Sequence, residues 1–148
     1  MLISDLIKRK GRGVVSLPVS AELHRAAKLM ASQGIGAIVV VNAAGGLEGL
    51  VAERDVVKAV TAGGRAVLRD KVDAWMRRRV PTAAPQAKVL EAIDLITAAR
   101  TRHLPVVEDG KVIGVLSVGD LLKSRLDEKT EENLVLRDIA RWPRAALA

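Results

Sequence analysis

Residues 114–120 read GVLSVGD and residues 49–55 read GLVAERD, so a glycine and an aspartate stand at the same places in both stretches. In each stretch a short apolar run passes through a bend into a segment with helical periodicity. Recurrence of this kind is typical of a chain built from a duplicated unit.

The repeat extends far beyond these two stretches. An alignment that places Ser16 on Thr82 reaches Asp55 and Asp120 with one single-residue slip, in the loop at residues 45–46. Both copies contain an apolar helical stripe, a short apolar run, a turn, a second apolar run and a closing helix. The predicted unit is strand–helix–strand–strand–helix (β-α-β-β-α), present twice in a mixed α/β fold of the α+β class.

Neither copy is large enough to bury a sufficient core alone. We therefore expect the two copies to pack sheet against sheet with pseudo-twofold symmetry and to enclose clefts. The apolar residues, 49% of the chain, are almost all Ala, Val, Leu and Ile, which suits strands buried against helices. The predicted boundaries are 1–65 for the first copy, 66–127 for the second copy with a lead-in helix at 71–78, and 128–148 for a C-terminal tail helix.

Composition argues against several classes of function. The chain has no cysteine, which excludes disulfides, thiolate metal sites and cysteine nucleophiles. No apolar stretch is long enough to cross a membrane and the first residues lack the order of a signal peptide, so we expect a soluble, cytoplasmic protein without a membrane partner. His24 and His103 belong to no metal-binding or nucleophile motif, so we expect neither a metal site nor an enzyme.

The formal charge of +7 raises the question of an anionic partner. Basic residues gather at 8–12 and at 77–79. Three interpretations stay open: a solvated basic surface, contact with a phosphorylated small molecule, or binding of nucleic acid. No aromatic residues interleave with either run and no recognition-helix or zinc-finger pattern accompanies them, so nucleic acid is the least supported of the three.

The stretch at residues 114–120 has the chemistry of a binding site. A bend that leads into a helix presents backbone N–H groups and a positive helix end to an anion, and Ser117 adds a hydroxyl donor. The carboxylate of Asp120 suits the two hydroxyls of a ribose. The alternative is that Ser117 and Asp120 only cap the helix.

The first copy keeps part of this chemistry. Asp55 occupies the place of Asp120, whereas Ala52 replaces the hydroxyl and Arg54 adds a possible phosphate contact. Arg102 and His103 enter a predicted strand near the cleft, and no cationic pair stands at the aligned positions of the first copy. These two residues either meet phosphates or are a surface arginine and a hydrogen-bonded histidine.

From about Leu2 to Arg125 the chain resembles a tandem pair of CBS domains (cystathionine-β-synthase-type), also called a Bateman module. The residues that carry the resemblance are 26–30, 49–55, 102–107 and 114–120. The resemblance implies a pseudo-twofold pair of units, a homodimer, and AMP, ADP or ATP as a regulatory ligand rather than a required cofactor. S-adenosylmethionine and NADH rank below these nucleotides.

The resemblance also implies roles for individual residues. The family pattern of Gly, two residues, Ser or Thr, two residues and Asp maps onto Gly114, Ser117 and Asp120, with Ser117 on phosphate and Asp120 on ribose. Asp55 matches in the first copy, where Ala52 departs from the pattern. Four other residues match binding positions of the family. The resemblance implies that Ser16 and Thr82 lie beside the adenine and that Arg102 and His103 contact the phosphates.

We expect a non-enzymatic regulatory module that senses cellular adenine nucleotides and signals to a protein effector or through dimerisation. Two alternatives remain. One is a purely structural dimerisation module with degenerate clefts, and the other is nucleic-acid association through the basic runs.

Overall fold

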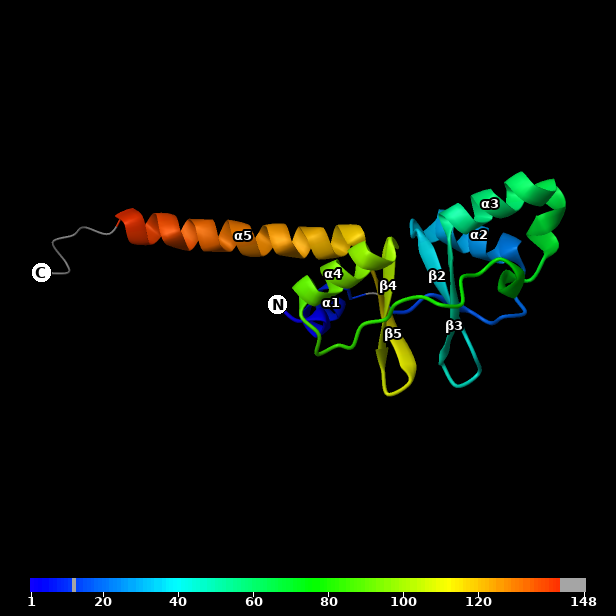
Figure 1. Cartoon of the computed structure of the whole chain (residues 1–148), viewed down its shortest axis with the longest axis horizontal. Helices are drawn as coiled ribbons and strands as arrows, with labels where there is room; N and C mark the ends of the chain where they lie inside the picture. Colours follow the sequence, from blue (N-terminus) through cyan, green and yellow to red (C-terminus); the bar gives the residue numbers. More distant parts are fainter. Residues whose placement is uncertain (12, 142–148) are drawn as a thin grey trace, which may run out of the picture.

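The computed structural model describes residues 1–11 and 13–141 (Figure 1). The elements in chain order are α1 (Ile3–Lys10), β1 (Ser16–Leu17), α2 (Leu23–Gln33), β2 (Ala37–Val41), β3 (Leu47–Ala52), α3 (Glu53–Gly63), the 3₁₀ helices η1 (Gly64–Arg69) and η2 (Val72–Ala74), α4 (Val89–Ala99), β4 (His103–Glu108), β5 (Lys111–Ser117) and α5 (Val118–Arg141). Both copies therefore contain the predicted helix, two-strand hairpin and closing helix.

The first copy is a three-stranded sheet of order β1-β2-β3 covered by α2 and α3. The predicted apolar stripe of α2 is buried, because Leu23, Ala26 and Met30 project from one face of the helix into the core. The helix ends at Gly34, whose φ of 62° is the left-handed conformation that favours glycine. The chain then turns into strand β2, which is buried at every residue except the last.

The second copy repeats this plan with a shorter first strand. β4 and β5 form an antiparallel hairpin, and the counterpart of β1 is a single parallel bridge between Ala83 and Val106. Pro81 and Pro85 flank that bridge, and a proline has no N–H to extend a ladder. The bridge is therefore confined to the hydrogen bonds that Ala83 makes with its neighbours in β4.

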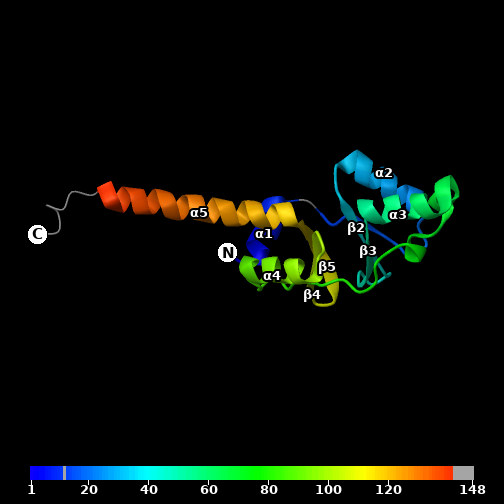
Figure 2. The same cartoon turned by 45° about the horizontal axis from the view of Figure 1, so that its top comes forward.

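The two sheets pack against each other, as the repeat predicts. Figure 1 and Figure 2 show β2, β3, β4 and β5 at the centre, with α2 and α3 outside one sheet and α1, α4 and α5 outside the other. Between the sheets lies a small apolar cluster of Ala37, Val39, Leu50 and Ala52, against which side chains such as Val112 and Val115 of β5 pack. Short aliphatic side chains at this interface allow the strands of the two copies to approach closely.

The segments that lead into the two copies are exchanged. α1 precedes the first copy, but Ile3 and Leu6 are buried in the core of the second. Conversely Val72 and Met76 precede the second copy and are buried in the core of the first. Because of this exchange, Lys10 of the first basic run lies beside the second copy, and Arg77 of the second basic run lies beside the first copy.

The connecting and C-terminal segments differ from the predicted helices. The lead-in helix expected at 71–78 is reduced to the turn η2, because Trp75 leaves the helical conformation and Arg77 instead pairs with Leu50 of β3. A separate tail helix does not begin at residue 128, since α5 continues without a break from Val118 to Arg141. Residues 142–148 of the expected tail lie outside the described residues.

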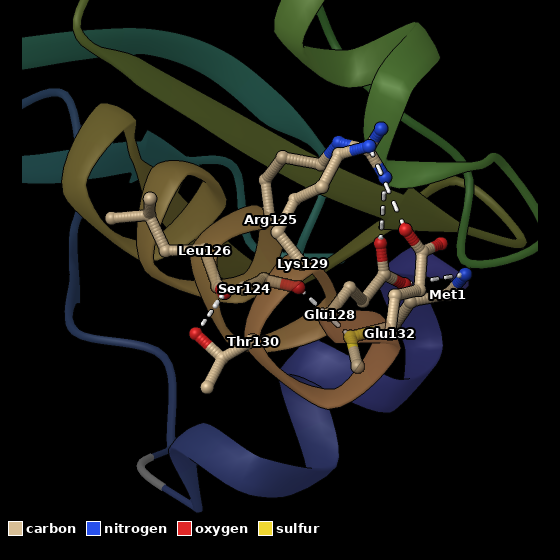
Figure 3. A network of polar contacts seen from close by, with 8 residues as sticks. All are labelled: Met1, Ser124, Arg125, Leu126, Glu128, Lys129, Thr130 and Glu132. Atoms are coloured by element: carbon tan, nitrogen blue, oxygen red, sulfur yellow. Dashed lines mark hydrogen bonds and ion pairs between the residues drawn. The ribbon is translucent and has the colours of Figure 1, made fainter. Parts of the chain in front are cut away.

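The first half of α5 is attached to the body and the second half projects from it (Figure 1). At the point of departure the Met1 ammonium contacts Glu128 at 3.1 Å, and the Ser124 hydroxyl lies 2.9 Å from the Met1 sulfur (Figure 3). Arg125 also contacts Glu128, at 3.3 Å. Within residues 1–11 and 13–141, no helix is both long and apolar enough to span a bilayer.

Candidate nucleotide-binding clefts

The larger of two clefts near the sheet interface has a volume of about 630 Å³. Aliphatic side chains of both copies line it, together with the polar side chains of Lys10, His103, Ser117 and Asp120. Small-molecule sites fall in the range of about 300–1,000 Å³ and combine mostly apolar walls with a few placed polar groups. This cleft has both properties.

Ser117 and Asp120 are fixed at the start of α5 by reciprocal hydrogen bonds. The Ser117 N–H donates to Asp120 Oδ2 at 2.8 Å, and the Asp120 N–H donates to Ser117 Oγ at 3.0 Å. This is a capping box, so the capping interpretation of the two residues is correct. Both side chains also line the larger cleft, so capping here orients groups that face a ligand-sized space.

The Asp120 carboxylate carries a negative charge in spite of partial burial. Burial alone raises the pKa of Asp120, but the Ser117 N–H and the Lys10 ammonium outweigh it and hold the pKa below its usual value. Both contacts are made to Oδ2, and among the described residues none donates to Oδ1. The carboxylate at the lining of the cleft thus keeps acceptor capacity.

Lys10 is a residue of the larger cleft that the sequence interpretation did not single out. Its ammonium donates to Asp120 Oδ2 at 2.9 Å and to the Val115 carbonyl at 2.8 Å. It reaches this position because α1 packs on the second copy, with Ile7 against Gly114. The only sequence signal was its membership of the basic run at 8–12.

The smaller cleft, of about 260 Å³, contains the corresponding carboxylate of the first copy. Asp55 is buried and accepts the Ala52 N–H at 2.7 Å on Oδ2. Ala52 has no side-chain oxygen to return the bond, so only half of the capping box forms. Arg77 Nε lies 3.4 Å from the same Oδ2 but is buried without an aligned hydrogen bond.

Cations outnumber carboxylates in the smaller cleft. Its charged lining consists of Glu53, Arg54, Asp55, Lys58, Arg77, Arg100 and Arg102. The Ala52 position removes a hydroxyl donor, but this excess of positive charge favours an anion there on electrostatic grounds. Arg77 takes part because the exchanged segment carries it to the first copy.

His103 lies between the two clefts and lines both. It begins β4 opposite Ser117, and its ring packs so closely on Gly36 that a Cβ at Gly36 would lie 3.0 Å from Nε2. Burial lowers the pKa of His103, and the positive charges of Arg77 and Lys10 lower it further. Glu53 and Asp120 act in the opposite direction with smaller effect.

The structure brings most of the predicted site residues to the two clefts. Gly114, Ser117 and Asp120 line the larger cleft, Arg54, Asp55 and Arg102 line the smaller one, and His103 lines both. Ser16 and Thr82 line neither cleft and are exposed. Ser16 has already entered the sheet beside Val39, so the residues just before it, Val14 and Val15, line the larger cleft instead.

The clefts have the chemistry of a binding site. Their acceptors and donors suit a sugar diol and an anion, and their walls suit an apolar ring. The residues that the structure describes hold no cluster of His, Cys, Asp and Glu able to ligate a metal ion.

Comparison with known proteins identifies the fold. The CBS domain model matches the chain twice, over residues 3–62 and 71–127. A mitochondrial CBS domain-containing protein of Arabidopsis thaliana is 33% identical over 138 residues, which cover 88% of this chain and 67% of that protein. The crystal structure of a CBS-domain containing protein from Agrobacterium tumefaciens has a TM-score of 0.79 and 36% identity, and the match covers 84% of this chain and 99% of that one.

A further solved structure carries a ligand. The CBS domain protein from Pyrobaculum aerophilum, complexed with AMP, has a TM-score of 0.73 and 27% identity, with coverage of 81% of this chain and 89% of that one. The duplicated β-α-β-β-α unit, the packing of sheet on sheet and the two matched ranges agree with one another. The chain therefore belongs to the CBS domain family and is a tandem pair of CBS domains.

Proposed function

We propose that this CBS pair binds an adenine nucleotide in the larger cleft and signals its level to a protein effector or through self-association. CBS-domain proteins of this kind are regulatory rather than catalytic. The observation that carries the proposal is the Ser117–Asp120 capping box, which holds a charged carboxylate and a hydroxyl at the lining of a mostly apolar space of about 630 Å³. AMP in the Pyrobaculum relative supports the choice of ligand class.

Each part of the nucleotide has a chemically matching partner in this cleft. Asp120 accepts the two ribose hydroxyls, and Ser117 with the start of α5 meets the phosphate. The base lies between aliphatic side chains such as Val14, Val15 and Ile35. A mononucleotide of about 23 heavy atoms at roughly 0.3 kcal/mol per atom binds with about 7 kcal/mol, or a Kd near 10 μM, on the order of ligand efficiencies for molecules of this size.

Isothermal titration tests this proposal directly. Nucleotide-free protein is titrated with AMP, ADP, ATP, S-adenosylmethionine and NADH, and we expect at least one adenine nucleotide to bind in the micromolar range. Asp120→Ala should abolish that binding, whereas Asp94→Ala, an exposed carboxylate on α4, should leave it unchanged. Absence of heat with every ligand would reject the proposal.

A second candidate function is dimerisation, and a specific observation favours it. The projecting half of α5 exposes Leu134, Val135, Leu136 and Ile139, each more than half accessible. Over residues 130–141 the charges nearly balance, with the anions Glu131, Glu132 and Asp138 against the cations Arg137 and Arg141. Two copies can therefore meet along this segment with little charge repulsion, although the whole chain carries +7. We infer a homodimer that pairs these segments.

A further inference from the structure

The carboxylate proposed to hold the sugar is already paired with a cation of the same chain. Lys10 Nζ contacts Asp120 Oδ2 at 2.9 Å and the Val115 carbonyl at 2.8 Å, and all three residues line the larger cleft. A ribose that approaches Asp120 must compete with this ammonium for Oδ2. Binding of the sugar therefore costs the free energy of the Lys10–Asp120 contact, unless the Lys10 ammonium finds a new partner.

The ammonium has a limited range of movement, because its helix is held in place. Ile3 and Leu6 are buried in the core of the second copy, and α1 ends at Gly11 in the left-handed conformation, with φ of 60°. The backbone of Lys10 therefore stays beside the cleft. Its side chain is 35% exposed and flexible, so the ammonium can turn about its stem while the helix remains docked.

A phosphate held at the start of α5 would lie within reach of that ammonium. Lys10 Nζ and the Ser117 N–H both lie within 3 Å of the same oxygen, Asp120 Oδ2, at 2.9 and 2.8 Å. A phosphate at Ser117 would therefore offer Lys10 a new partner at little distance from the old one. An unphosphorylated nucleoside offers no such partner.

Resting on the proposed function, we propose that Lys10 makes the larger cleft selective for phosphorylated nucleosides, by pairing with Asp120 in the empty cleft and transferring to the ligand's phosphate when the sugar takes its place. Nucleosides and nucleotides both displace Lys10 from Asp120. Only a nucleotide offers the displaced Lys10 ammonium a new partner, because its phosphate can form a charge-assisted hydrogen bond with it. Lys10 thus acts as a specificity-determining residue.

The smaller cleft has a related arrangement, which supports the argument from geometry. There Arg77, also delivered by an exchanged lead-in segment, lies 3.4 Å from Asp55 Oδ2. Asp120 and the corresponding carboxylate Asp55 thus each lie close to a cation from the segment that precedes the opposite copy. The recurrence of a cation beside the corresponding carboxylate in both copies argues against a chance surface ion pair at Lys10.

The test compares AMP with adenosine in three proteins by isothermal titration. We expect Lys10→Met to bind adenosine more tightly and AMP more weakly than the wild type, so that the ratio of the two Kd values changes by at least about tenfold. Lys10→Arg should largely restore the ratio. Lys8→Met, which removes an equal charge from the same helix but lines neither cleft, should leave it unchanged.

The outcomes separate this inference from the proposed function. If the wild type binds AMP and the ratio in Lys10→Met is unchanged, the inference is wrong and the proposed function stands. An equal loss of both ligands would also overturn it, because Lys10 would then support the shape of the cleft rather than its selectivity. If ADP or ATP rather than AMP is the nucleotide that the wild type binds, it takes the place of AMP in the comparison. If the wild type binds no adenine nucleotide, the proposed function fails and the inference falls with it. Far-ultraviolet circular dichroism of each variant verifies folding.

Discussion

His103 is the single ionisable residue of the described chain that lines both clefts. Burial and the positive charges of Arg77 and Lys10 lower its pKa, and the weaker opposing effects of Glu53 and Asp120 do not restore it. The imidazole is therefore neutral at pH 7. A bound phosphate adds negative charge beside the ring and raises the pKa again, so binding is coupled to uptake of a proton.

This coupling predicts that AMP binds more tightly as the pH falls. As the pH falls from 8 to 6.5, His103 becomes protonated in the complex before it does so in the free protein. We therefore expect the Kd for AMP to decrease several-fold over this range. His103→Asn should show a flatter dependence. AMP itself begins to take up a proton near the lower limit, and that contribution is the same in both proteins. Parallel pH profiles for the two proteins would show that His103 is not coupled to the ligand.

At the scale of residues, the sequence was informative where chemistry is local. Ser117 and Asp120 follow a strand and open a helix, so their position at a helix start could be read from neighbouring residues. Lys10 and Arg77 could not be placed in this way, because each belongs to a lead-in segment that packs on the other copy. Hydrophobic periodicity shows which face of a segment is buried but not against which copy it packs.

At the scale of elements, the exchange of lead-in segments depends on a close approach at Gly49. A Cβ at this position would lie 2.6 Å from Met76 Sδ and 2.9 Å from the Arg77 carbonyl oxygen. The second contact is with backbone, and that backbone is held by two hydrogen bonds of 2.9 Å to Leu50. The segment therefore cannot move aside without breaking its attachment to β3.

Gly49→Ala is accordingly expected to destabilise the protein. The added methyl group forces Arg77 away from β3, and overpacking of this kind costs about 1–3 kcal/mol. Gly13→Ala is the matched control, because nothing lies within 4 Å of a Cβ at Gly13. Urea unfolding of the two variants and the wild type measures the difference. Equal stability of all three proteins would show that the attachment of the segment tolerates a shift.

In some elements, contacts with the rest of the fold override the structure that the local sequence favours. Propensity favoured a helix at 71–78, but the pairing of Arg77 with Leu50 and the burial of Val72 and Met76 hold this segment in a turn and an extended stretch. The helix pairs and both hairpins were predictable, since their periodicity is strong and each is closed by a turn of a few residues. The continuous length of α5 was not predictable, because the charge pattern of residues 118–141 does not indicate whether the helix is interrupted.

At the scale of the whole molecule, the two candidate functions occupy different places. The clefts lie at the interface between the two copies of one chain, whereas the exposed apolar side chains lie on the projecting half of α5 (Figure 1). That segment is bordered by a groove of about 780 Å³ with Met1, Leu90, Val135 and Leu136 in its lining. Binding and dimerisation should therefore be separable by substitution.

The separation gives a prediction for the full chain. Val135→Glu with Ile139→Glu places two charges on the side of α5 that carries these two exposed apolar residues, and Thr130→Glu with Asn133→Glu places the same two charges on the opposite side of the helix. Sedimentation velocity should show a dimer for the wild type and the second variant, and a monomer for the first. Because the larger cleft needs no residue of α5 beyond its first turn, all three proteins should bind AMP with similar Kd values. A monomeric wild type at tens of micromolar would refute the dimer, and loss of AMP binding together with the dimer would mean that a second chain completes the cleft.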